Sequence, residues 1–296
     1  MDKKLVLTWA GAARPKTLAA AFVPVLVGSS LAYSDGVFFL PASLTALFCA
    51  LLIQIGTNFA NDYYDFKKGA DTEQRIGFTR ATSTGLIEPR QMLLATYITM
   101  TMAFLTGLYL VWLAGWVILV IGLLSLLFGI LYTGGPFPLG YNGLGDVFVF
   151  IFFGFAAVMG TYYVNALSWS ADSFIASVPV GALSVNILVA NNLRDIEQDK
   201  IVNKKTLGVL FGESVLKWEY TLMILLSYFI LLYLNMFQNY NLYIYIPLLT
   251  LPLTVILLRE IWFHRDKSTL NKTLEKTARF MVVYGVLFSA GILLQS

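Results

Sequence analysis

Two clusters of amide and carboxylate side chains have the spacing of a helix face. They are Asn58, Asp62 and Asp65, spaced i, i+4 and i+7, and Asn191, Asp195 and Asp199, spaced i, i+4 and i+8. Side chains at such positions lie on one side of an α-helix. Each cluster therefore predicts a row of oxygen atoms along a helix surface.

Oxygen ligands of this kind suit a hard cation, above all Mg²⁺. Mg²⁺ is usually held by one or two carboxylates together with phosphate groups of a substrate. The chain has one cysteine and one histidine, which excludes a disulfide framework and a Cys/His zinc site. The clusters thus predict one Mg²⁺ each, with a polyphosphate between them.

Basic residues near both clusters are candidates for binding phosphate oxygens that a metal leaves free. They are Arg14, Lys16, Arg75, Arg80, Arg194, Lys204 and Lys205. Charges just beyond an apolar segment are often only solvated, and we interpret Lys67 and Lys68 in that way. Two similarly built clusters favour a functional site more strongly than one would.

The composition identifies the kind of protein that must position these residues. Of 296 residues 58% are hydrophobic and 12% charged, and the mean hydropathy is +0.73. Globular chains carry about 25% charged residues, so this is an integral membrane protein. Nine ranges are long and apolar enough for spanning helices: 17–33, 41–60, 91–113, 115–133, 147–169, 174–192, 218–235, 242–262 and 278–294.

The charges are sorted to one side of these nine spans. All 20 lysines and arginines precede the first span, lie between spans 2 and 3, 6 and 7, or 8 and 9, or stand within four residues of that last connection, as Arg259 and Arg279 do. All but Asp35 and Asp172 of the 17 acidic residues join them. The positive-inside rule then predicts a cytoplasmic N-terminus and an external C-terminus in the cell membrane.

We therefore expect an all-α integral membrane bundle forming a single domain over residues 1–296. Residues 61–90 and 194–217 are its main cytoplasmic loops and would carry the active site. The clusters lie four spans apart, as a parallel internal repeat of four helices would place them. No feature indicates a nucleic-acid partner, and the oligomeric state is left open.

A third stretch, residues 132–146, links spans 4 and 5 on the same side. Three glycines and two prolines in its first nine residues predict a shaped turn rather than a helix. From composition alone, an ordinary interhelical loop is an equal alternative.

Together these residues resemble the UbiA superfamily of intramembrane aromatic prenyltransferases, over nearly the whole chain. Residues 61–80, 132–154 and 191–212 are most similar to its 1,4-dihydroxy-2-naphthoate branch. The resemblance implies that Asn58, Asn61, Asp62 and Asp65 form the first Mg²⁺/diphosphate motif. It also implies that Asp195 and Asp199 form the second, with Tyr132, Asn191 and the basic residues binding substrate.

Two positions depart from the family pattern. The first motif often reads N-D-x-x-D-x-x-x-D, but Gly69 stands at its last position and the role of Asp71 is open. Many relatives also carry Tyr-x-x-x-Lys after span 4, where this chain has Tyr132 and Pro136. Either Arg14 or Lys16 replaces that lysine, or it is not needed.

The resemblance further implies the reaction. A polyprenyl group would pass from its diphosphate to 1,4-dihydroxy-2-naphthoate, with loss of diphosphate and CO₂, to give demethylmenaquinone. A related enzyme using 4-hydroxybenzoate or a chlorin acceptor is the nearer alternative. A cation transporter is the remote one, because transporters set their ion ligands near the bilayer midplane rather than at one face.

Overall fold

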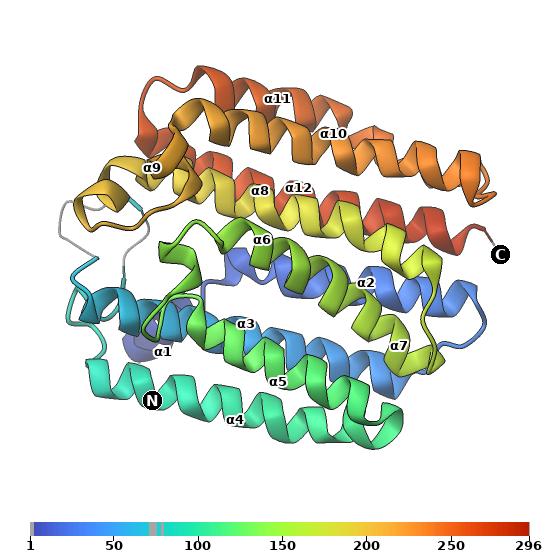
Figure 1. Ribbon diagram of the computed structural model, residues 1–296, viewed down its shortest axis with the longest axis horizontal. Helices are drawn as coiled ribbons and strands as arrows, with labels where there is room; N and C mark the ends of the chain where they lie inside the picture. Colours follow the sequence, from blue (N-terminus) through green and yellow to red (C-terminus); the bar gives the residue numbers. More distant parts are fainter. Residues whose placement is uncertain (1–2, 71–75, 78–79, 296) are drawn as a thin grey trace.

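The structure is a computed structural model that describes residues 3–70, 76–77 and 80–295. Every regular element within these ranges is helical (Figure 1). In chain order they are α1 (Lys3–Ala12), η1 (Pro15–Thr17), α2 (Ala19–Ser34), α3 (Leu40–Lys67), α4 (Pro89–Ala114), α5 (Trp116–Leu131), η2 (Leu139–Tyr141), α6 (Gly145–Val149), η3 (Phe150–Met159), α7 (Gly160–Ala166), α8 (Ala171–Ile201), α9 (Leu207–Phe211), α10 (Glu213–Phe237), η4 (Leu242–Thr250), α11 (Leu251–Phe263), η5 (Lys267–Thr269) and α12 (Leu270–Leu293). The all-helical prediction is confirmed.

Long apolar helices make this a multi-pass membrane protein, because a backbone in lipid must satisfy its own hydrogen bonds. Seven helical segments are long and apolar enough to cross a membrane, and α1 with α2 adds an eighth if that bent pair is one span. Each of the nine predicted ranges coincides with helix, but α5 has only 16 residues. The number nine therefore stays a prediction.

The two helices that carry the carboxylate clusters are the longest among the described elements. α3 has 28 residues and α8 has 31. At 1.5 Å per residue their lengths are about 42 and 46 Å, whereas the hydrocarbon core of a bilayer is about 30 Å thick. Their polar ends can therefore lie outside the hydrocarbon, and both ends are on the same side of the bundle (Figure 1).

The helices pair in the same order in the two halves of the chain. α3 packs mainly against α4, and α8 packs mainly against α10. α5 lies against α4, and η4 and α11 lie against α10, while α12 packs against α2, α8 and η4. This is the arrangement that a parallel four-helix repeat gives.

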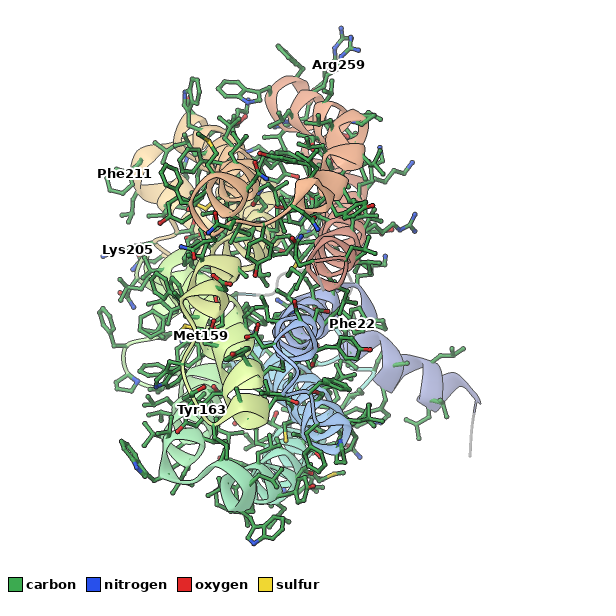
Figure 2. The ribbon with its side chains drawn as sticks, turned by 90° about the vertical axis from the view of Figure 1, so that its right-hand side faces the viewer. Phe22, Met159, Tyr163, Lys205, Phe211 and Arg259 are labelled. Atoms are coloured by element: carbon green, nitrogen blue, oxygen red, sulfur yellow. The ribbon has the colours of Figure 1, made fainter. Side chains whose placement is uncertain are left out.

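The N-terminal helix α1 projects from the side of the bundle (Figure 2). The segment Leu5–Thr17 is bent by 52° relative to Ala19–Ser34. The side chains of Leu5, Val6 and Leu7 are exposed, whereas the ring of Trp9 packs edge-on against Phe59 of α3 at 5.6 Å between centroids. α1 is thus attached to the bundle through its C-terminal half.

The two acidic residues outside the basic end hold the opposite end of the bundle together. The Tyr162 hydroxyl donates to Asp35 at 2.6 Å, which joins α7 to the end of α2. The Tyr240 hydroxyl donates to Asp172 at 3.1 Å, which joins the α10–η4 connection to the start of α8. Both acids therefore have structural partners far from the carboxylate clusters.

Close glycine contacts bring α8 against the span formed by α6, η3 and α7. A Cβ atom added at Gly154 would lie 2.9 Å from the Ser177 carbonyl oxygen and 3.0 Å from the Cα atom of Gly181. Small residues allow helices in membranes to approach in this way. The contact fixes η3, a π-helix of ten residues, against the helix that carries the second cluster.

Candidate active site

Both carboxylate clusters lie on the last turns of their helices, as predicted. α3 continues without a break to Lys67, so Asn58, Asp62 and Asp65 share one face. These residues are 3%, 1% and 4% exposed. Asp195 and Asp199, near the end of α8, are each 5% exposed. Carboxylates so far from water need partners, and these partners define the site.

The two clusters meet in a small polar recess. Its described lining residues are Asp65, Ala70, Tyr141, Asp195, Gln198, Asp199 and Lys204. Three of the four predicted metal ligands therefore face one space, although they come from segments about 130 residues apart in the sequence. We call this space the polar recess.

Asp65 is held by two side chains from two different loops. The Tyr141 hydroxyl donates to its Oδ1 at 2.8 Å, and Arg80 donates through Nη2 to its Oδ2 at 3.0 Å. Arg80 is itself only 8% exposed. Arg80, predicted to bind phosphate, thus contacts a carboxylate at the edge of the recess.

Asp195 is paired with its neighbour in the sequence. Arg194 donates through Nε and Nη2 to the two oxygens of Asp195, at 2.6 and 2.7 Å. Its Nη2 also donates to Asn191 Oδ1 at 2.7 Å, and its Nη1 donates to Asn271 Oδ1 at 2.9 Å. Arg194 is 1% exposed, so a guanidinium predicted to bind substrate is a buried support for Asp195.

Asp199 forms the third acidic wall of the polar recess. The Lys204 ammonium lies 3.4 Å from its Oδ1, and the Lys204 backbone N–H donates to the Asp199 carbonyl oxygen at 2.8 Å. The same ammonium lies 5.5 Å from the centre of the Tyr141 ring. Lys204 therefore stands beside the recess, as expected of a phosphate-binding residue.

Lys68, interpreted from sequence as a solvated charge, is exposed but also contacts the residue 132–146 loop beside this site. Its ammonium donates to the Thr133 carbonyl oxygen at 2.6 Å and lies 4.3 Å from the centre of the Tyr141 ring. Partial burial lowers the pKa of Lys68, nearby Asp65 opposes that shift, and Lys204 adds to it. No motif marks this lysine, because only folding brings the loop of Tyr141 beneath it.

Asp62, the fourth predicted metal ligand, contacts backbone N–H groups. Its Oδ2 accepts the backbone N–H of Ala81 at 3.1 Å and its Oδ1 that of Thr82 at 3.0 Å. The described wall of the polar recess does not include it. Both oxygens are engaged because residues 80–87 fold back over this turn of α3.

The remaining predicted residues near the N-terminus and α3 have mainly structural contacts. Asn58 donates to the Ala13 carbonyl oxygen at 2.9 Å, which ties the segment after α1 to α3. Asn61 Oδ1 accepts the Thr133 hydroxyl at 2.7 Å. Lys16 forms an ion pair with Glu275 of α12. The described wall of the recess includes none of the predicted residues Asn58, Asn61, Arg14 and Lys16.

Two predicted residues, Asp71 and Arg75, lie outside the described residues. Lys205, also predicted to bind phosphate, has an exposed side chain, and its backbone N–H donates to the Tyr141 carbonyl oxygen at 3.0 Å. It therefore helps to position the Tyr141 loop through its backbone.

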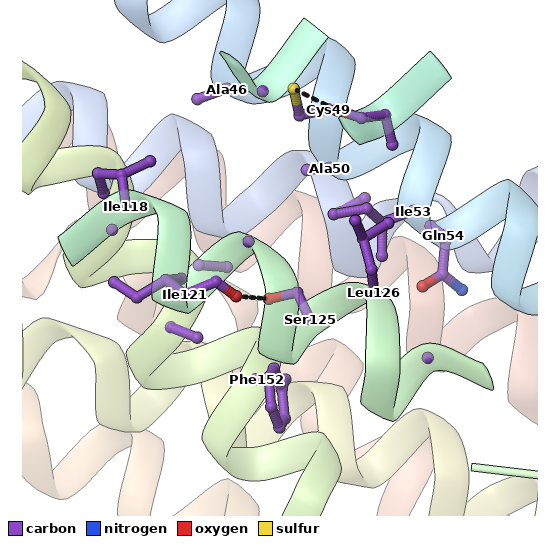
Figure 3. A pocket seen from close by; sticks show the side chains of 18 of the residues that line it. Ala46, Cys49, Ala50, Ile53, Gln54, Ile118, Ile121, Ser125, Leu126 and Phe152 are labelled. Carbon is purple, nitrogen blue, oxygen red and sulfur yellow. Dashed lines mark hydrogen bonds between the residues drawn. The ribbon is translucent and has the colours of Figure 1, made fainter. Parts of the chain in front are cut away.

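An apolar chamber runs between α2, α3, α4, α5 and the α6–α7 span (Figure 3). Its empty space is about 1340 Å³ with the open solvent at its mouth included, and its wall is mostly hydrocarbon. Gln54, Thr57, Ser125, Tyr132 and Thr161 are the polar side chains in its described lining. Such a space suits a long apolar ligand.

The chamber and the polar recess are adjacent through the residue 132–146 loop. Tyr132 is part of the chamber wall, and Tyr141 is part of the recess wall. Gly140 packs between them, because a Cβ atom there would lie 3.0 Å from the Tyr132 ring. The Gly140 N–H also donates to the Tyr132 carbonyl oxygen at 2.9 Å. The glycine-rich stretch is thus a shaped turn.

Comparison with known proteins identifies this architecture. The model of the UbiA prenyltransferase family matches residues 21–284, most of the chain. The chain belongs to the UbiA prenyltransferase family. The resemblance stated from the sequence is confirmed.

Curated relatives of this UbiA-family chain match it over nearly its whole length. The 1,4-dihydroxy-2-naphthoate octaprenyltransferase of Escherichia coli (strain K12) is 36% identical over 292 residues, which cover 97% of this chain and 95% of the relative. The enzyme of the same name from Bacillus subtilis (strain 168) is 31% identical, covering 95% and 90%.

Solved structures of UbiA homologues share the fold. The homologue from Archaeoglobus fulgidus bound to DMAPP and Mg²⁺ has a TM-score of 0.68 at 15% identity, covering 95% of this chain and 99% of that one. The apo homologue from Aeropyrum pernix K1 has a TM-score of 0.71 at 12% identity, covering 94% and 97%.

The donor set of this UbiA-family site fits Mg²⁺ shared with a phosphate ligand. Within the described ranges, no three acidic, histidine or cysteine side chains form a complete metal cage. Asp65, Asp195 and Asp199 nevertheless face one recess beside Lys204. Mg²⁺ needs only one or two carboxylates when substrate phosphates supply further oxygens.

Tyr141, Gln198 and Asn271 were not among the residues predicted from the sequence. Gln198 donates to the Ala70 carbonyl oxygen at 2.9 Å and lines the recess. Asn271 accepts from Arg194 and donates to the Ile76 carbonyl oxygen at 3.0 Å. The usable signals were the position of Gln198 inside the second cluster and that of Tyr141 inside the residue 132–146 stretch, whereas Asn271 lies on α12 with no such signal.

Proposed function

We propose that this UbiA-family enzyme transfers a polyprenyl group from polyprenyl diphosphate to 1,4-dihydroxy-2-naphthoate. Diphosphate and CO₂ are released, and the product is demethylmenaquinone. The observation that carries the proposal is the polar recess at the end of an apolar chamber, which suits a ligand with a charged head and a long apolar tail. The names of the full-length relatives support the naphthoate as acceptor.

Mg²⁺ is the proposed cofactor, with Asp65, Asp195 and Asp199 as the residues that hold it. When bound, it neutralises charge on the diphosphate oxygens as that group leaves. The Mg²⁺ in the Archaeoglobus homologue supports the choice of metal.

Residues of this chain then act on the two ends of the donor. Lys68 and Lys204 attract the diphosphate, and their charges are more effective as negative charge builds on the leaving oxygen. The chamber receives the polyprenyl tail and excludes water, which would otherwise quench an allylic cation. Tyr132, Phe148 and Phe152 line the chamber, and their ring faces can stabilise that cation.

The proposed membrane arrangement has nine crossings in the cell membrane, with the N-terminus in the cytoplasm and the C-terminus outside. Its support is the sorting of the basic residues to the end of the bundle that holds the recess. Arg14, Lys16, Asn58, Asn61, Tyr132 and Asn191 remain predicted contributors to substrate binding. A charged donor head would thus be taken from the cytoplasm and its tail from the bilayer.

The test uses the purified full chain with Mg²⁺, a long-chain prenyl diphosphate, and either 1,4-dihydroxy-2-naphthoate or 4-hydroxybenzoate. We expect prenylated naphthoquinol with the first acceptor and at least 100-fold less product with the second. Preference for hydroxybenzoate would reassign the acceptor. No product with either acceptor would contradict the proposed prenyl transfer.

Comparing Asp65→Ala with Asp35→Ala distinguishes a loss of catalysis at the site from a general loss of folding stability. We expect Asp65→Ala to abolish turnover while the protein stays monodisperse. Asp35→Ala, at the opposite end of the bundle, should keep the wild-type rate even if it lowers the melting temperature. Equal losses in both variants would contradict the placement of the reaction at the recess.

A further inference from the structure

Asp62 stands apart from the other three aspartates of the two clusters. Asp65, Asp195 and Asp199 line the polar recess, and the described wall does not include Asp62. Asp62 is 1% exposed, and each of its two oxygens accepts one backbone N–H. Both oxygens are therefore engaged in holding backbone N–H groups of another segment, outside the described wall of the recess.

The N–H groups that Asp62 accepts belong to a short helical turn. The Thr84 N–H donates to the Arg80 carbonyl oxygen at 3.2 Å, and the Leu86 N–H donates to that of Ala81 at 2.9 Å. The first N–H groups of such a turn have no partner inside the turn. Asp62 supplies that partner from another element, as an N-cap residue does from within the chain.

The same turn carries Arg80, which reaches Asp65. Asp62 and Asp65 are three residues apart on α3, so they lie one above the other. Ala81 and Thr82 dock on Asp62, and the preceding Arg80 is thereby set 3.0 Å from Asp65 Oδ2. Ala81 and Ile87 are also buried in a small apolar cluster with Phe59.

We infer that Asp62 is a positioning residue: it holds the turn at residues 80–87 so that Arg80 lies on Asp65 at the recess. It does not bind metal. The inference rests on the proposed function for the role of Asp65, but the docking of the turn on Asp62 does not depend on the reaction.

The first measurement is hydrogen exchange of the peptide covering residues 81–87 in the metal-free full chain. Asp62→Asn should speed this exchange at least tenfold, because an amide can accept only one of the two N–H groups. Asp65→Asn should change it less than threefold. Unchanged exchange in Asp62→Asn would overturn the inference whether or not the protein proves to be a prenyltransferase.

The second measurement is the Mg²⁺ concentration that gives half-maximal activity. Asp65→Asn should raise it at least tenfold, whereas Asp62→Asn should leave it within twofold and instead raise KM for the prenyl diphosphate. Arg80→Lys should raise KM similarly, and the double variant should be no worse than either single one. A large rise in the Mg²⁺ requirement of Asp62→Asn would make Asp62 a metal ligand after all.

If Asp62→Asn cannot be purified as a monodisperse protein, Asp62→Glu takes its place. The longer carboxylate keeps both acceptors, so exchange in residues 81–87 should rise less than threefold while KM rises through displacement of Arg80. A changed Mg²⁺ requirement with unchanged exchange would again contradict the inference.

Discussion

At the scale of single residues, the acidic site is stabilised by neighbours that satisfy nearly every carboxylate oxygen before substrate arrives. Arg194 meets Asp195 with two parallel bonds and is itself held by Asn191 and Asn271. A buried arginine with such a planar fork cannot be replaced by lysine without loss of these bonds. The carboxylates are thus preorganised.

Lys68 and Lys67 form a matched pair for testing which basic side chains bind the diphosphate. Lys68 lies over the Tyr141 ring, and Lys67 is exposed at the end of α3. Lys68→Ala should raise KM for the prenyl diphosphate about tenfold, which corresponds to about 1.4 kcal/mol. Lys67→Ala should change it less than twofold, in steady-state assays at saturating acceptor. Similar effects of both changes would mean that the diphosphate is attracted by the overall positive charge of this surface and not by Lys68 in particular.

Cys49 offers a direct probe of the apolar chamber, because it is the one cysteine in the chain. It lines the chamber, is 8% exposed, and its Sγ lies 3.7 Å from the Ala103 carbonyl oxygen. A small apolar maleimide should label it slowly, and a long-chain prenyl diphosphate with Mg²⁺ should slow labelling at least fivefold. Mass spectrometry of the intact protein measures this. Inorganic diphosphate is the control, and equal protection by it would place the tail elsewhere.

At the scale of elements, close packing of two spans sets the position of the second carboxylate cluster. η3 meets α8 through Gly154 and Gly181, with no room for a side chain between them. Because α8 carries Asp195 and Asp199 further along, a shift at this contact moves the acids relative to α3. The contact between η3 and α8 therefore helps to set the geometry of the site.

Gly154→Ala tests this contact, with Gly122→Ala as its control. The added methyl group at Gly154 meets backbone atoms, and such overpacking costs about 1–3 kcal/mol. A Cβ atom at Gly122 has nothing within 4 Å. We expect a lower melting temperature in detergent for Gly154→Ala alone. Equal melting temperatures for the two variants would show that η3 and α8 can separate without cost.

At the scale of the whole molecule, the polar recess and the apolar chamber adjoin each other. The recess lies where α3 and α8 extend past the apolar core, and the chamber follows α3 and α5 toward the opposite end. Tyr132 and the Gly140 turn form the boundary between them. This layout matches a substrate whose head is ionic and whose tail is insoluble in water.

Gly122 gives a test of how the chamber accommodates the tail. It lies on the chamber wall ten residues before Tyr132 in the sequence, or about 15 Å along the α5 direction. Gly122→Phe should lower kcat/KM at least tenfold for a long-chain prenyl diphosphate and less than threefold for geranyl diphosphate. Equal losses for both donors would mean that the tail leaves the chamber before reaching this point.

The sequence by itself determined the helices, the membrane and the rows of acidic side chains. Helical hydrogen bonds and face periodicity are local, so Asn58, Asp62 and Asp65 could be placed on one face without knowing their surroundings. The sorting of basic residues likewise needs only the order of the spans. The meeting of the two clusters followed from their equivalent places in the two halves of the chain.

Only the tertiary structure decided what each oxygen does. Asp62 accepts backbone N–H groups and Lys68 lies over Tyr141. Asn271 joins Arg194 to Ile76, which lies 195 residues before Asn271 in the sequence. These contacts depend on the paths of the loops and on which oxygen a donor reaches. Neither produces a periodic pattern of residue types that could be recognised in the sequence. Residue types therefore predicted the chemistry of the site. The role of each residue depends on contacts between segments that are distant in the sequence, and these are known only from the tertiary structure.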